Sequence, residues 1–218
     1  MLSFITVYHK FCGVTIGLRI FRERFFANRR PSFHIGWQTV IYFILMFFSG
    51  RGEILLPNLA AALLHEAGHF FAMAVTGTEV KSVLVTPFGA VIEKGRRLSG
   101  FGTDLFVSSA GIAANLLSAL LLLPFRSDER IALFLVSDLV LALLNLLPVG
   151  ILDGGEMLTA LLSLSLTADS VRKYASAVSF LSLIPLWCVS VYFLFFGEGD
   201  PSLFFLTVCL FLTMTGKK

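Results

Sequence analysis

The chain has 218 residues, of which 56% are hydrophobic and 14% are charged, and its formal net charge at pH 7 is +3. About a quarter of the residues of a soluble domain are charged, so this composition, with a mean hydropathy of +0.86, excludes an ordinary soluble domain and indicates a membrane protein. The three cysteines form no closely spaced pair, which argues against a disulfide framework and a thiolate zinc site.

The N-terminal segment, residues 1–33, combines six basic residues with many Phe, Ile and Val residues. This mixture predicts a basic amphipathic segment that lies on the cytoplasmic face or interface of a membrane, where anionic lipids attract it. Nucleic acid is the poorer explanation of these basic residues, because apolar side chains interrupt them throughout. No nucleic-acid partner is therefore expected.

Six stretches are apolar enough to cross a bilayer, which takes about 20 apolar residues in a helix. They cover residues 34–50, 54–76, 103–124, 130–149, 174–196 and 201–215, and the fourth continues in a broken form to about residue 166. The predicted fold is an all-α polytopic membrane protein with about six transmembrane helices. In this prediction residues 34–166 form the membrane core, and residues 167–218 add two C-terminal helices.

The distribution of basic residues predicts the orientation of these spans. If the N-terminus is cytoplasmic, 14 of the 17 Lys and Arg residues lie on the cytoplasmic side. Only Arg51, Arg126 and Arg130 then lie outside. Because basic residues are retained on the cytoplasmic side, both termini are expected there.

The connection after the second span differs from the others. Residues 78–93, TEVKSVLVTPFGAVIE, are rich in β-branched residues and are interrupted by Pro87 and Gly89, a pattern that predicts strands and a turn. Backbone outside a helix is tolerated at membrane depth only where protein or water provides hydrogen-bond partners for its N–H and C=O groups. We therefore expect a small re-entrant or interfacial β-hairpin packed on the helices, with an ordinary cytoplasmic loop as the alternative.

Residues 65–69, HEAGH, lie within the apolar second span. His65 and His69 are four residues apart, so both imidazoles project from one face of a helix and can bind one zinc ion. Glu66 lies beside them, where its carboxylate can reach a water on that zinc and act as a general base. Ionisable residues are costly inside a membrane, so a functional role is expected. A buried hydrogen-bonded pair that stabilises the helix bundle is the alternative.

A catalytic zinc site needs a third protein ligand and one open position. The two remaining histidines, His9 and His34, lie in or next to the basic N-terminal segment, so the third ligand is predicted to be a carboxylate at membrane depth. Asp153, in NLLPVGILDGG (145–155), meets this requirement because Pro and Gly residues break the helix around it. The predicted topology also places Asp153 at the depth of the two histidines.

Three further polar residues lie inside predicted spans. Asp138 and Asn145 are nearly two helical turns apart and share a face. A structural hydrogen-bonding role is predicted for Asp138, with a contact to the metal site as the alternative. Asn115 lies among small residues that permit close helix packing.

Four segments of the sequence together resemble the site-2 proteases, a family of intramembrane zinc metalloproteases. They are HEAGH (65–69), TPFGAVIE (86–93), AGIAANLL (110–117) and LLNLLPVGILDGG (143–155), in the order in which the family has them. The TPFGAVIE segment and the small size are most similar to the sporulation subgroup that processes the membrane-bound pro-sigma-K precursor. Asp138 stands where Asn is common in the family. The PDZ and CBS domains that other members carry are not expected here.

The resemblance implies a zinc metalloendopeptidase with one Zn²⁺ per chain. In this interpretation His65, His69 and Asp153 hold the metal, and Glu66 is the general base. Stabilisation of the oxyanion or positioning of the substrate is assigned to Asn115 and Asn145. An unwound substrate would pair as an added β-strand with the segment that contains Val83, Val85, Phe88 and Gly89.

The implied activity is hydrolysis of a peptide bond in a membrane-tethered protein, which would release a transcription factor such as a sigma factor. The expected location is a bacterial cell membrane, with the lipid bilayer and an inhibitory membrane protein as further partners. Two alternatives come from other functional classes: a metal transporter and a non-catalytic zinc-binding scaffold. A transporter predicts a polar path across the membrane, whereas the ionisable residues here cluster at one depth.

Overall fold

The computed structural model describes residues 32–36, 39–41, 44, 48, 52–86, 89–94, 100–196 and 201–215. In chain order the elements are β1 (Ser32–Ile35), α3 (Gly52–Thr76), β2 (Val80–Thr86), β3 (Gly89–Lys94), α4 (Phe101–Leu122), a 3-10 turn (Leu123–Phe125), α5 (Glu129–Leu146), α6 (Asp153–Leu162), α7 (Ala168–Phe196) and α8 (Ser202–Thr215). All but the last two residues of the predicted amphipathic segment 1–33 lie outside the described residues.

Three of the described helices are long and apolar enough to cross a membrane. They cover Glu53–Thr76, Phe101–Phe125 and Ala168–Phe196, and a shorter apolar helix covers Leu203–Met214. These helices lie where the second, third, fifth and sixth spans were predicted. The first predicted span, 34–50, falls mostly outside the described residues, and it does not begin as a helix at His34 because residues 34 and 35 belong to β1.

The fourth predicted span ends earlier than expected. Helix α5 stops at Leu146, and Leu147 adopts an extended conformation with a ψ of 135°. The residue that follows is Pro148, whose ring disfavours the helical conformation of the residue before it. The chain therefore leaves the helix before the glycines and begins again as α6 at Asp153.

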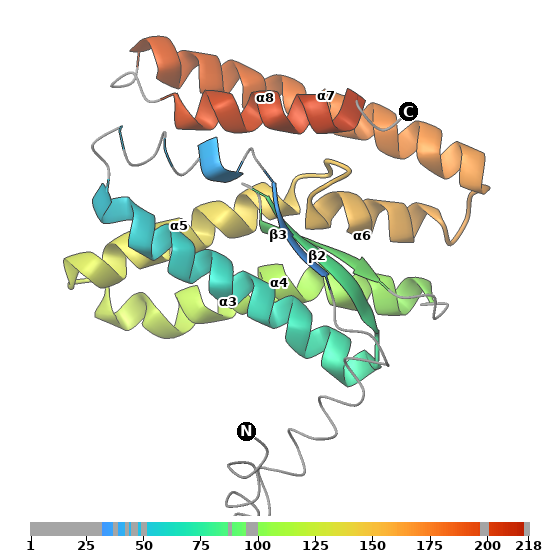
Figure 1. The fold of residues 1–218 in the computed structure, drawn as a ribbon, viewed down its shortest axis with the longest axis horizontal. Coiled ribbons are helices and arrows are strands. Elements are labelled where there is room, and N and C mark those ends of the chain that lie inside the picture. The colour runs from blue at the N-terminus through green and yellow to red at the C-terminus, as the bar shows by residue number, and fades with distance from the viewer. Residues whose placement is uncertain are drawn as a thin grey trace, which may run out of the picture.

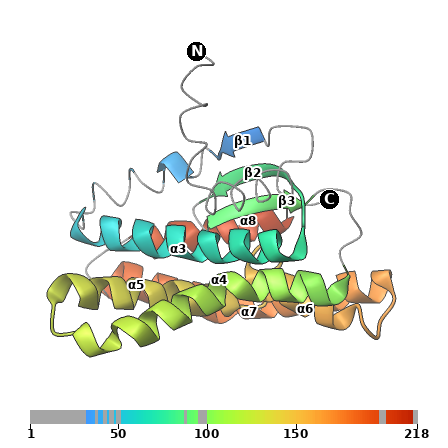
Figure 2. The ribbon, with the colours of Figure 1, turned by 90° about the horizontal axis from the view of Figure 1, so that it is seen from below.

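The three described strands form one sheet in the order β1-β2-β3. Strand β1 pairs parallel with β2, and β2 pairs antiparallel with β3, with Thr86 opposite Gly89 next to the turn. Figure 2 shows β1 outermost and β3 nearest the helices. Phe88, in the turn, lies outside the described residues.

This topology changes the expected position of substrate pairing. Val83 and Val85 lie on the central strand, where each pairs with a residue of β1 and a residue of β3. Their backbone groups are therefore not at an edge of the sheet, because β1 lies on one side of β2 and β3 on the other. Among the described residues, the outer edge of β3 pairs with no strand.

Two apolar clusters hold the described elements together. The first, formed by Ala72, Met73, Val80, Val83 and Val107, packs the end of α3 against β2 and α4. The second, formed by Val149, Leu152, Leu183 and Leu210, packs the 147–152 loop against α7 and α8. Helices α3, α4 and α5 each pack against the other two, and α6 packs mainly on α4. Helices α7 and α8 lie side by side, and α7 also contacts α6 (Figure 1).

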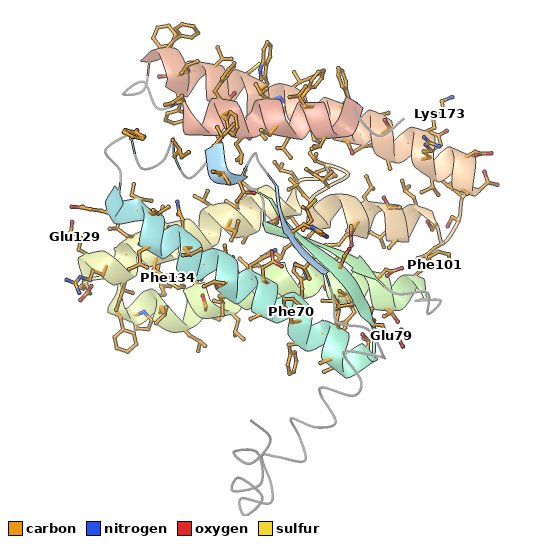
Figure 3. All side chains as sticks on the ribbon, in the orientation of Figure 1. Phe70, Glu79, Phe101, Glu129, Phe134 and Lys173 are labelled. Carbon is orange, nitrogen blue, oxygen red and sulfur yellow. The ribbon has the colours of Figure 1, made fainter. Side chains whose placement is uncertain are left out.

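The outer surface of the helices is apolar. Leu120, Leu121, Leu143, Phe195 and Phe196 are all more than half exposed. Figure 3 shows Glu129 at one end of the helices and Glu79 and Lys173 at the opposite end. An apolar belt between charged ends is the reverse of a soluble surface and suits a surrounding bilayer.

Candidate metal centre

Helix α3 presents two histidines on one face toward the interior. His65 and His69 are 3% and 6% exposed, and their Nε2 atoms are 3.1 Å apart. The two rings are nearly perpendicular, with centroids 4.7 Å apart. Both imidazoles therefore aim a nitrogen at the same point, as the one-turn spacing of HEAGH requires.

Asp153 comes to that point from a different helix. Its Oδ2 lies 2.9 Å from Nε2 of His65 and 3.1 Å from Nε2 of His69. Asp153 is the first residue of α6, where the exposed amides of a helix N-terminus favour a carboxylate. The three side chains form a group that could hold a metal ion, with their ligand atoms within 4.8 Å of one another.

The two glycines after Asp153 allow α6 to begin so close to α5. A Cβ on Gly154 would lie 2.3 Å from the carbonyl oxygen of Leu146, and one on Gly155 would lie 2.2 Å from that of Val149. Real Cβ atoms do not approach backbone this closely, so only glycine fits at both positions. The LDGG sequence thus brings the carboxylate to the histidines by allowing contact between two backbones.

The hydrogen bonds of His69 define which of its nitrogens is free. Its Nδ1 lies 2.8 Å from the carbonyl oxygen of Val107, which can only accept, so Nδ1 carries the proton. The Nε2 of neutral His69 is then an acceptor, and it faces the acceptor oxygen of Asp153. Two acceptors at this distance repel each other unless a proton or a metal cation lies between them.

The arrangement fits zinc in both chemistry and size. Two imidazoles and one carboxylate are the ligand set of many catalytic zinc sites, which keep a fourth position open. Ligand atoms about 2.05 Å from a tetrahedral zinc are about 3.3 Å apart. The three separations here, 2.9, 3.1 and 3.1 Å, are close to that value.

The other predicted site residues have different surroundings. Glu66 is half-buried on α3, beside the two histidines. Asn145 is buried near the end of α5, and its Nδ2 donates to the carbonyl oxygen of Leu141 at 3.1 Å. Asn115 on α4 and Asp138 on α5 are both fully enclosed. Asp138 accepts a hydrogen bond from the hydroxyl of Ser118.

Gly111 on α4 was not predicted as part of the site. A Cβ at this position would lie 2.4 Å from Nε2 of His69 and 2.8 Å from Cε1 of His65. The only signal in the sequence is its place in AGIAANLL, which indicates close packing without identifying the partner. The carbonyl group of Val107 has no sequence signal, because every residue has one.

Hydrogen bonds between helices hold the surroundings of Asp153. The hydroxyl of Ser108 on α4 donates to Oε2 of Glu156 on α6 at 2.9 Å. On the other side, the hydroxyl of Ser179 on α7 accepts from the amide of Gly150 at 3.1 Å and lies 3.0 Å from the carbonyl oxygen of Pro148. Hydrogen bonds to α7 therefore hold the 147–152 loop, and a hydrogen bond to α4 holds the start of α6.

Comparisons with known proteins concern the fold and one segment of the chain. Residues 128–186, which include Asp153, match the model of Peptidase family M50. The structure is similar to that of the site-2 protease from Methanocaldococcus jannaschii, with a TM-score of 0.67 and 16% sequence identity over 85% of this chain and 89% of that chain. The chain has the fold of a site-2 protease. No curated protein sequence matches it significantly.

Proposed function

We propose that the protein is an intramembrane zinc metalloprotease of the site-2 type. The observation that carries the proposal is the convergence of His65, His69 and Asp153, from two helices, on one nearly enclosed point. The shared fold and the match to a peptidase family model support it. A zinc ion held by these three side chains would supply Lewis-acid chemistry to a water molecule and to the scissile carbonyl.

The residues of the chain have distinct tasks in this proposal. Glu66 accepts the proton of the attacking water and passes it to the leaving amine. The carbonyl group of Val107 keeps Nε2 of His69 unprotonated. The Nδ2 of Asn115, which has no hydrogen-bond partner among the described residues, donates to the carbonyl oxygen of the substrate as charge develops. The Oδ1 of Asn145 positions the substrate.

The substrate is expected to be a membrane-tethered protein in a bacterial cell membrane, such as the precursor of a sigma factor. The apolar belt of the helices supports the membrane location, and the TPFGAVIE segment supports the sigma-factor expectation. A substrate helix must unwind before cleavage, because its backbone groups are hydrogen-bonded to one another. Pairing with a strand satisfies the freed groups.

We place this pairing on the outer edge of β3, with Gly89 at its start, because β2 is paired on both sides. Proline substituted in turn at residues 90–93 should then give two alternating classes of variant. Where the amide faces β2, proline should lower the melting temperature. Where the amide faces outward, proline should abolish cleavage and leave the melting temperature unchanged. Normal cleavage by both outward-facing variants would contradict the assignment.

The experiment that tests the proposed function needs no known substrate. We expect about one zinc per chain in the detergent-purified protein and loss of that zinc in His65→Ala and Asp153→Ala. Zinc that remains bound in Asp153→Ala would remove the proposed third ligand. No zinc in any form, after incubation with the metal, would contradict a zinc enzyme.

Glu66→Gln separates catalysis from metal binding. The amide keeps the size of the carboxylate but cannot accept the proton of the attacking water, so zinc content should stay the same while cleavage of a membrane-tethered substrate stops. General bases contribute roughly 10²–10⁴-fold to rate, so a loss of at least this size is expected. Cleavage at the unaltered rate would show that Glu66 is not the base.

A further inference from the structure

The two histidines of the centre differ in what holds their second nitrogen. The Nδ1 of His69 lies 2.8 Å from the carbonyl oxygen of Val107. The Nδ1 of His65 is buried, and no described residue provides it with a hydrogen-bond partner. Metal-binding histidines almost always donate their other N–H to a carboxylate, a carbonyl group or water, which fixes the ring and its tautomer. His65 therefore needs an acceptor behind its ring.

Two fully enclosed side chains also have polar atoms without a partner among the described residues. They are Asp138, through Oδ1, and Asn115, through both atoms of its carboxamide, and both residues are 0% exposed. Buried polar groups are rarely left without partners, since each costs about 1–3 kcal/mol. The acceptors available to the Nδ1 proton of His65 are therefore Oδ1 of Asp138 and Oδ1 of Asn115.

The three residues lie on helices that all pack against one another. Gly68 of α3 lies against Ala110 and Ala114 of α4, while Gly111 lies against both His69 and His65. Asn115 lies one turn beyond Gly111 on the same face of α4, which brings it to the His65 end of the contact. Helix α5, which carries Asp138, packs against both α3 and α4.

Asp138 is the better of the two acceptors for His65. Its other oxygen, Oδ2, accepts a hydrogen bond from Ser118, which fixes the orientation of the carboxylate. Ser118 also lies 3.3 Å from the backbone carbonyl oxygen of Asn115, so its hydroxyl places Asp138 beside this part of α4. A carboxylate binds an imidazole N–H more strongly than a neutral amide does, because the hydrogen bond is assisted by charge.

We propose that Asp138 is a positioning residue that accepts the Nδ1 proton of His65 through Oδ1, directly or through one water molecule, and so aims Nε2 at the metal. This inference rests on the proposed function, since it assigns Asp138 a task only if His65 is a ligand. Asp138 itself touches neither metal nor substrate. Val107 and Asp138 then have equivalent tasks, one for each histidine.

The test measures zinc affinity and the imidazole N–H proton resonances of the zinc-loaded 218-residue chain, labelled with ¹⁵N-histidine. Its four histidines must be assigned. In the unaltered protein the Nδ1 protons of His65 and His69 should both be shifted downfield by their hydrogen bonds. In Asp138→Ala the His65 resonance should move upfield or exchange away, while that of His69, held by Val107, stays in place. Zinc affinity, measured by competition with a chelator, should fall about 10–100-fold.

Three further variants separate the role of Asp138 from general effects on folding and from the role of Asn115. Asp138→Asn has the same size and can still accept, so it should fold and give intermediate changes in both measurements, including in the case where Asp138→Ala fails to fold. Ser137→Ala, on the same helix, removes a hydroxyl that, among the described residues, donates to the carbonyl oxygen of Leu133, and it should change neither measurement. Asn115→Ala removes Oδ1 of Asn115, the other available acceptor, and should leave the His65 resonance in place.

Each outcome has a distinct meaning. An unchanged His65 resonance and zinc affinity in both Asp138 variants would overturn the inference, as would a change of the His65 resonance in Asn115→Ala alone. Absence of zinc from the unaltered protein would instead overturn the proposed function.

Discussion

Gly111→Ala is expected to abolish zinc binding and with it any proteolysis. The new methyl group would lie 2.4 Å from Nε2 of His69 and within 2.8 Å of both rings, where no real side chain fits. Either the His69 ring rotates away from the centre or α4 moves away from α3, and both changes separate the ligand atoms. We expect zinc affinity to fall by at least about 100-fold, the upper end of what a change outside the ligands produces. Metal content and a chelator titration measure this directly.

The matched control for this variant is on the same helix. Gly102→Ala adds the same methyl group to α4 at a position where it would meet nothing within 4 Å. It should bind zinc as the unaltered protein does, and it should be slightly more stable because alanine favours a helix over glycine. If Gly111→Ala also bound zinc normally, the contact between α4 and the two imidazoles would not exist as described.

Gly155→Ala is expected to weaken the centre from the side of Asp153. Its Cβ would lie 2.2 Å from the carbonyl oxygen of Val149 and 2.7 Å from Cα of Gly150, so α6 must move away from the 147–152 loop. Both neighbours are backbone atoms and cannot rotate aside. We expect a loss of about 1–3 kcal/mol in stability, typical of overpacking, and a fall in zinc affinity of about 10–100-fold.

Gly150→Ala is the control for this second prediction. It lies in the same loop, but its Cβ would meet only the Ser179 hydroxyl, at an ordinary distance of 3.8 Å. Zinc affinity should be unchanged, and the melting temperature should stay close to that of the unaltered protein. Equal effects of the two substitutions on zinc would show that the loop itself, and not its contact with α6, determines the position of Asp153.

Prediction from the sequence was most successful where the spacing of residues within one element fixes their relative positions. Two histidines four residues apart in a helix must share a face, so HEAGH needed no tertiary information to indicate a pair of ligands. Long apolar runs likewise predicted the helices α3, α4 and α7, because a helix that faces lipid needs about 20 predominantly apolar residues. The break before Asp153 followed from Pro148, although the helix ends earlier than the apolar pattern suggested.

Prediction was least successful where a residue acts through a partner distant in sequence. A strand at residues 32–35 could not be expected from an apolar segment, and its pairing with β2 moves the open edge of the sheet to β3. Strand pairing between distant segments depends on which segments the tertiary fold places next to each other, and the periodicity of side chains in one segment does not reveal this. The same limit applies to Asp138, whose role depends on its distance from His65.

The sequence by itself determined the class of protein, the apolar helices and three side chains suited to zinc. The first two follow from composition, the two histidines from their spacing within one helix, and Asp153 from its predicted depth and the break in the helix around it. Only the tertiary structure decided that Asp153 meets the histidines, that Gly111 lies against both rings, and that Val107 orients one of them. Those are contacts between different helices, and their geometry depends on how closely two backbones approach, which is a property of the packed bundle and not of any one segment.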